Sequence, residues 1–122
     1  MIKLGLAAGI VAAAFVPGLA EARCSHSGYQ ITPSRNSSAT VDMRASSGRD
    51  CVIRLSASRR FTVTGRRIVE HPGKGKVTIE GETAFYRSFA GFVGEDRFVA
   101  EVSAKGSDGE GTSTILVVVT VE

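Results

Sequence analysis

Residues Tyr86 to Val102 read YRSFAGFVGEDRFVAEV, and this stretch carries the sharpest local pattern in the chain. In its second half, Phe98, Ala100 and Val102 alternate with arginine, valine and glutamate, as expected for a half-buried strand. Asp96 stands at the start of this run, where a carboxylate either binds a ligand or shapes the entrance to the strand. The stretch predicts a turn that leads into a strand, so the role of Asp96 depends on the surrounding fold.

The same period-two alternation recurs along the chain, and almost no helical period is present. Each run is short and is bounded by glycine, proline or serine residues that favour turns. The alternating runs occupy residues 40–44, 51–56, 61–64, 76–80, 97–102 and 114–121. Short half-buried strands at this spacing, about seven in all, are typical of a β-sandwich or barrel. No linker or internal repeat divides residues 23–122, so we expect one domain.

The last run, Thr114 to Val121, is apolar at nearly every position. Its odd-numbered residues from Ile115 onward can face the core, which leaves Leu116 and Val118 on the outer face. Two interpretations remain open. Either this strand is covered on both sides within the fold, or Leu116 and Val118 form an apolar patch that meets a partner.

The N-terminal 22 residues have the organisation of a Sec-type signal peptide. Lys3 supplies the early positive charge, an apolar run follows from Leu4 to Ala20, and Ala20-Glu21-Ala22 is a small-x-small cleavage site. The run is short for a span of about 20 residues and contains Pro17, which argues against a membrane anchor. We therefore expect a mature chain from residue 23, located in the periplasm or secreted, with no membrane span after cleavage.

The mature chain contains two cysteines, Cys24 and Cys51. An even number of cysteines in a small exported domain predicts a disulfide, and two cysteines allow one connectivity. The alternative, a metal or redox pair, is poorly supported because there is no C-x-x-C motif and only His26 and His71 could assist. The disulfide should stabilise the fold by roughly 3–4 kcal/mol.

The C-terminal half resembles the bacterial immunoglobulin-like and cadherin-like repeats of exported adhesins. The residues that carry this resemblance are Val69, Pro72, Gly75, Val77–Ile79, Tyr86, Gly91, Phe92, Gly94, Asp96, Phe98, Val102, Gly109 and Val117–Val121. Two positions depart from the family pattern. Ser88 stands where the family usually has a proline, and Ala100 stands where it often has an aromatic residue. The resemblance implies an immunoglobulin-like antiparallel β-sandwich of about seven strands for residues 23–122.

Within this resemblance, Gly94 and Asp96 have a structural interpretation. Gly94 permits a backbone conformation that larger residues avoid, and Asp96 can accept hydrogen bonds from turn amides. The functional alternative is calcium, which cadherin relatives bind between tandem repeats. A calcium site needs six to eight oxygens, and the chain offers Glu95, Asp96, Asp108 and Glu110 in different loops. We therefore predict that Asp96 shapes the turn.

The formal net charge of +3 conceals an uneven distribution. Residues 23–67 hold nine arginines and two aspartates, a formal charge of +7, whereas residues 68–122 hold five basic and nine acidic residues, a charge of −4. Such asymmetry is either a solvated face or a surface for polyanions or acidic proteins.

Five arginines lie within fourteen residues and define what we call the arginine patch: Arg54, Arg59, Arg60, Arg66 and Arg67. If the two strands that carry them pair as a hairpin, their guanidinium groups share one outward surface. The only acidic residues nearby in sequence are Asp50 and Glu70, too few to neutralise the patch. Our hypothesis is that this surface docks on an anionic envelope polymer or an acidic partner protein, and the alternative is that the patch is only a solvated face.

The chain lacks the common catalytic motifs: it has no G-x-S-x-G, no H-E-x-x-H and no Walker loop. Its aromatic residues lie mostly at core positions and do not interleave with the arginines, which argues against nucleic-acid binding. We predict a non-enzymatic binding or structural module of the bacterial cell envelope, without cofactor or metal. The alternative is a small inhibitor or accessory subunit of an exported enzyme.

Overall fold

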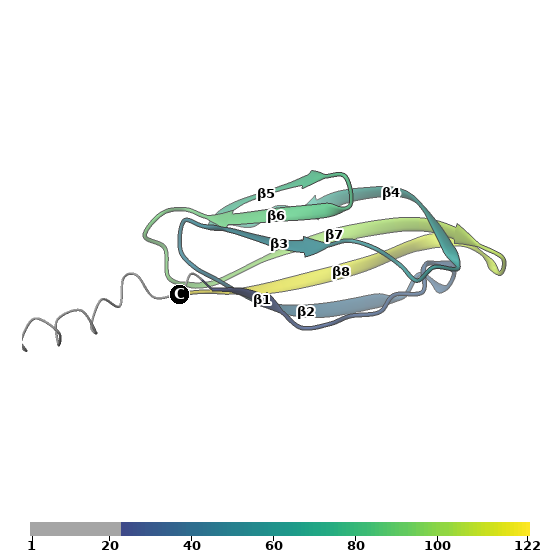
Figure 1. Ribbon diagram of the computed structural model, residues 1–122, viewed down its shortest axis with the longest axis horizontal. Helices are drawn as coiled ribbons and strands as arrows, with labels where there is room; N and C mark the ends of the chain where they lie inside the picture. Colours follow the sequence, from purple (N-terminus) through teal and green to yellow (C-terminus); the bar gives the residue numbers. More distant parts are fainter. Residues whose placement is uncertain (1–22) are drawn as a thin grey trace, which may run out of the picture.

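The computed structural model describes residues 23–122, which form an all-β fold of two packed sheets (Figure 1). The predicted signal peptide lies outside the described residues. The elements are β1 (Cys24–His26), η2 (Pro33–Arg35, a 3-10 helix), β2 (Ser38–Ala45), β3 (Asp50–Arg54), β4 (Phe61–Glu70), β5 (Gly75–Glu80), β6 (Thr83–Ser88), β7 (Gly94–Gly106) and β8 (Gly109–Val121). Within residues 23–122, the structure has no helix with the length and apolar character needed to cross a membrane.

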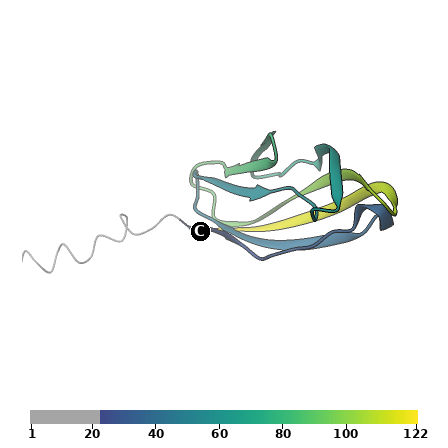
Figure 2. The ribbon, with the colours of Figure 1, turned by 45° about the vertical axis from the view of Figure 1, so that its right-hand side comes forward.

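The two layers of the sandwich differ in size, as Figures 1 and 2 show from two directions. One sheet has the order β1-β2-β8-β7-β4 and the other the order β3-β6-β5. This arrangement confirms the predicted all-β sandwich and is compatible with an immunoglobulin-like topology. The sequence pattern predicts about seven strands, and the short β1 brings the number in residues 23–122 to eight.

One pairing differs from the predicted antiparallel arrangement, because β2 and β8 run parallel. Their register aligns Ser38 with Thr114 and Ala45 with Val121. A short hairpin forces neighbouring strands to be antiparallel, but β2 and β8 come from opposite ends of the chain and no such turn joins them. Alternation alone carries no information about this direction, since side chains alternate equally in both kinds of pair.

The core lies between the sheets and is built from the alternating residues that the sequence pattern indicated. The largest fully buried side chains include Tyr86, Phe98, Met43, Ile53, Leu55, Ile115 and Val117. On β8, Leu116 and Val118 are half-buried, because this strand lies between β2 and β7 in the middle of the larger sheet. Neighbouring strands thus shield much of the outer apolar surface of β8.

The predicted disulfide is confirmed and joins Cys24 to Cys51. The two Cα atoms lie 5.2 Å apart, within the usual range for a disulfide. Cys24 belongs to β1 in the larger sheet and Cys51 to β3 in the smaller one. The bond therefore links the two layers at the sandwich edge where the described chain begins.

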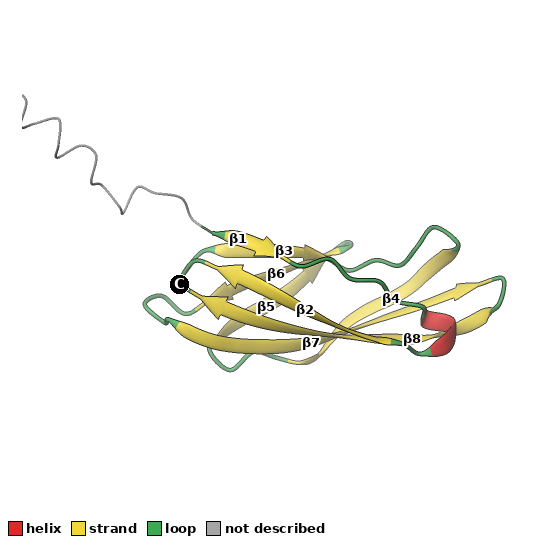
Figure 3. Ribbon diagram, turned by 90° about the horizontal axis from the view of Figure 1, so that it is seen from below, coloured by secondary structure: helices red, strands yellow, loops and turns green. Residues whose placement is uncertain are grey.

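The 3-10 helix η2 fixes the other end of the segment that follows β1. It lies beside the end of the long β7–β8 hairpin (Figure 3), where Asn36 Oδ1 accepts a hydrogen bond of 2.9 Å from the Thr112 amide. A side chain at Gly111 would collide with the Pro33 carbonyl, so this close approach requires glycine. Residues 27–32 are consequently held between the disulfide and η2.

Candidate functional site

The structure separates the arginine patch into two sheets, so the predicted hairpin is wrong. Arg54 ends β3, which pairs with β6, whereas Arg66 and Arg67 lie in β4, which pairs with β7. The buried Leu55 keeps the chain beside β6, since its amide donates to the Glu82 carbonyl oxygen at 2.7 Å. The chain then crosses to the other layer before Phe61 begins β4. Arg59 and Arg60 lie in this connection.

Two of the five arginines are neutralised by carboxylates that are distant in sequence, Arg54 by Glu82 in the turn before β6 and Arg67 by Glu101 on β7. Arg54 Nη2 lies 2.7 Å from Glu82 Oε1, and Arg67 Nε lies 2.9 Å from Glu101 Oε1. A hydrogen bond from Arg54, together with its positive charge, holds the pKa of Glu82 below its ordinary value. The expectation that the patch lacks acidic partners therefore fails for these two residues, because strand pairing brings in acids that are remote in sequence.

The acids near the patch in sequence have other partners. Asp50 accepts from Arg87 at 2.8 Å, and Glu70 accepts from Arg97 at 3.3 Å. These exposed pairs contribute little to stability. They do show that Asp50 and Glu70 are paired with arginines outside the patch. Within residues 23–122, Arg59 and Arg60 are both exposed and neither forms an ion pair.

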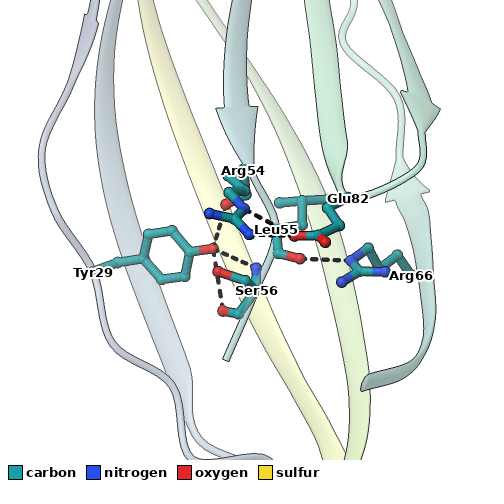
Figure 4. Close-up of polar contacts among 6 residues, drawn as sticks. All are labelled: Tyr29, Arg54, Leu55, Ser56, Arg66 and Glu82. Carbon is teal, nitrogen blue, oxygen red and sulfur yellow. Dashed lines mark hydrogen bonds and ion pairs between the residues drawn. The ribbon is translucent and has the colours of Figure 1, made fainter. Parts of the chain in front are cut away.

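Arg66 has a structural contact of its own. Its Nε donates to the Leu55 carbonyl oxygen at 2.6 Å, and its side chain is half-buried (Figure 4). This bond crosses from β4 to the end of β3 and so ties the two sheets together. Arg66 therefore supports the connection that carries Arg59 and Arg60.

Tyr29 holds the same segment from the opposite side (Figure 4). Its hydroxyl donates to the Arg54 carbonyl oxygen at 2.5 Å and accepts from the Ser56 amide at 3.0 Å. A neighbouring parallel strand would make these same two bonds to the residues that flank Leu55. The hydroxyl thus takes the place of a paired strand and satisfies the open edge of β3 at this point.

A cleft of about 730 Å³ lies between the segment after β1 and the segment after β3. We call it the Tyr29 cleft; its lining residues are His26, Gly28, Tyr29, Gln30, Ile31, Thr32, Arg54, Ser56, Ala57, Ser58 and Arg60. This set of described residues contains two arginines, several hydroxyl groups and a carboxamide, but no aspartate or glutamate. Arg60 also stacks on Phe61, with Cζ 5.5 Å from the ring centroid, which limits the positions of its side chain.

Asp96 and Gly94 lie at the opposite end of the sandwich, at the start of β7. Asp96 is buried and accepts hydrogen bonds from the Gly73 and Lys74 amides at 3.0 and 3.1 Å and from the Tyr86 hydroxyl at 2.8 Å. Burial, together with the hydrogen bond to Asp96, raises the pKa of Tyr86 above its ordinary value. The carboxylate therefore joins the turn between β4 and β5 to β6 and β7.

Gly94 has a φ angle of +142°, in the region that side chains disfavour, and an added Cβ would approach the Phe92 ring to 3.2 Å. The carboxylates weighed for calcium are separated: Asp96 begins β7, whereas Asp108 lies in the turn at its far end. Among residues 23–122, no three side chains of the histidine, cysteine, aspartate or glutamate type come together as metal ligands.

The Tyr29 cleft and the role of Tyr29 were not anticipated from the sequence. A tyrosine between glycine and glutamine has no local signal, since its partners are 25 and 27 residues away. The clue that could have been used is the disulfide, which places residues 24–29 beside β3. In comparisons with known proteins, no family model matches the chain and no curated protein matches it.

Proposed function

We propose that this chain is a non-enzymatic binding module of the immunoglobulin-like type, exported to the bacterial cell envelope, and that it docks on anionic polymer. Export is supported by the leader-like N-terminal sequence and by the disulfide between Cys24 and Cys51. The small sandwich with exposed connections suits a module that presents a surface.

The observation that carries the docking proposal is the exposure of Arg59 and Arg60 without ion pairs in the described chain. Of the five residues in the arginine patch, Arg54 and Arg67 are neutralised and Arg66 is engaged by a backbone carbonyl. Two neighbouring unpaired guanidinium groups beside an acid-free cleft form a local positive surface. Such a surface attracts polyanions through charge.

The test is co-sedimentation of the protein with envelope fragments at two salt concentrations. The parent should bind at low salt and weaken steeply as the Debye length shortens from about 30 Å at 0.01 M to about 8 Å at 0.15 M. The double variant Arg59→Ser/Arg60→Ser should lose most of this binding while it keeps its fold. If its binding equals that of the parent, the docking proposal is wrong.

The matched control is Arg49→Ser/Lys76→Ser, which removes the same charge from two exposed residues away from the Tyr29 cleft. Within residues 23–122 neither of these residues forms an ion pair. The control should bind nearly as well as the parent. Capture of one stoichiometric acidic protein in place of polymer would instead favour the inhibitor or accessory-subunit alternative.

A further inference from the structure

We infer that the Tyr29 cleft binds a segment of acidic saccharide, with Arg60 as the ligand to a sugar carboxylate. This inference rests on the proposed function and goes further, because it assigns the ligand class and one residue. The cleft volume of about 730 Å³ falls within the range of small-ligand sites, roughly 300–1,000 Å³, and suits a few sugar rings.

The charge in the cleft points to an anionic ligand. Arg54 and Arg60 are its two guanidinium groups, and Glu82 already holds Nε and Nη2 of Arg54 at 2.8 and 2.7 Å. Arg60 is therefore the cleft arginine that has no ion pair in the described chain. A planar guanidinium forms two parallel hydrogen bonds with a carboxylate, which selects this group over a neutral hydroxyl.

The remaining lining matches the hydroxyl groups and ring surfaces of sugars. Thr32, Ser56 and Ser58 provide hydroxyls that both donate and accept, and Gln30 provides a carboxamide. Tyr29 adds an aromatic ring whose position is fixed by its two hydrogen bonds to the β3 segment. Hydroxyl and carboxamide groups, with His26, thus surround one cation that has no ion pair in the described chain. This lining is suited to a hydroxyl-rich ligand of low charge density.

An extended acidic peptide fits this site less well. Peptides bind sheet edges through free backbone N–H and C=O groups. Here the Ser56 amide and the Arg54 carbonyl, which a peptide strand would need, are already occupied by the Tyr29 hydroxyl. These two backbone groups are therefore closed to a peptide strand, and recognition at this point depends on side chains.

The experiment is a titration of the full protein with a galacturonic acid tetramer, followed by calorimetry and by amide chemical shifts. Arg60→Ser should weaken binding about tenfold, the value of one lost charge-assisted contact. The matched control is Arg59→Ser, which removes the same charge from the adjacent residue outside the cleft lining and should weaken binding less than about threefold. Arg60→Lys keeps the positive charge but loses the planar guanidinium that forms two parallel hydrogen bonds, so this variant should bind more weakly than the parent.

Three results would overturn the inference. Equal losses for the Arg59→Ser and Arg60→Ser variants would mean that binding depends on the positive charge of the whole surface. The docking proposal would then stand, but the cleft would not be the binding site. Equal or tighter binding of a glutamate oligomer, inorganic phosphate or a neutral galactose tetramer would refute the acidic-saccharide class. If the parent binds envelope fragments but not the tetramer, the saccharide inference fails, whereas loss of envelope binding itself refutes the proposed function.

Discussion

The change of Asp96 to alanine tests whether a single buried carboxylate organises one end of the sandwich. Its side chain accepts from the Gly73 and Lys74 amides, the Tyr86 hydroxyl and the Arg97 amide, at 2.8 to 3.1 Å. Asp96 is 6% exposed, whereas Tyr86 is fully buried. The substitution therefore removes the acceptor of four donors at once, and one of these donors has no access to solvent.

The magnitude follows from the fate of each donor. A hydrogen bond to a charged group contributes about 1.5–3 kcal/mol, and a buried donor without a partner costs about 1–3 kcal/mol. Gly73 and Lys74 belong to an exposed turn, whereas the Tyr86 side chain is fully buried, so the Tyr86 hydroxyl should carry the largest penalty. Loss of the buried charge also removes its desolvation cost. We expect a net loss of about 3 kcal/mol from a total stability of about 5–15 kcal/mol.

The assay is urea unfolding followed by far-ultraviolet circular dichroism, with the disulfide intact in every sample. Glu95→Ala is the matched control, since Glu95 is the exposed neighbouring carboxylate and should cost less than about 0.5 kcal/mol. A cost for Asp96→Ala below about 1 kcal/mol, or one equal to the control, would refute the structural role. Calcium should leave the melting temperature of the parent unchanged; a rise of several degrees would instead indicate a metal site.

Three further predictions concern the disulfide and the two tyrosines. Replacement of Cys24 and Cys51 by serine should lower the free energy of unfolding by about 3.5 kcal/mol, because the bond spans 27 residues; two free thiols in the mass spectrum of the native protein would contradict this. Tyr29→Phe should cost about 1 kcal/mol, since the ring still packs but the β3 edge loses its hydroxyl partner, and unchanged stability would reject that role. The pKa of Tyr86 is raised in the folded state, so its contribution to stability is complete below pH of about 10 and is lost as the pH rises above it. The Tyr86→Phe variant should accordingly show a shallower alkaline decline in unfolding free energy than the parent, and parallel declines would count against a raised pKa of Tyr86.

The features of the fold that depend on local pattern were predictable from the sequence. Alternation identifies Ile53, Phe98 and Val117 as core residues, and each is buried because a strand with one face toward a second sheet buries alternate side chains. The disulfide was predictable because two cysteines, in a small domain that the sequence predicts to be exported, leave one connectivity. These inferences need no knowledge of which strands are neighbours.

The features that depend on strand order were not predictable in the same way. The parallel pairing of β2 with β8 and the separation of β3 from β4 both follow from topology, which short alternating runs do not encode. The short β1 has three exposed residues and so lacks the alternating burial that marks the other strands. The disulfide and its pairing with β2 hold it in place, although its own sequence has little strand character.

The arginines show how topology decides which charges remain available for binding. Strand pairing brings Arg54 close to Glu82, in the turn that leads into β6, and Arg67 close to Glu101 on β7, although these acids are 28 and 34 residues away in sequence. The connection between the sheets is not a strand, and no carboxylate of the described chain lies within ion-pair distance of Arg59 or Arg60. Arg59 and Arg60 remain unpaired within the described chain because they lie where the chain leaves one layer for the other.

The crossing therefore explains both the free charge and the cleft. Residues 55–60 pass from the smaller sheet to the larger one. Residues 28–32 run from the end of β1 to η2 and belong to no strand. Space remains between these two segments, and Tyr29 bridges it with its hydroxyl while its ring lines the wall. A substitution that lets residues 55–60 pair with a neighbouring strand would close the cleft and supply partners for the arginines together. The binding site that we propose is thus a consequence of a sheet-to-sheet connection, and its ligand should depend on Arg60 more than on the total charge of the domain.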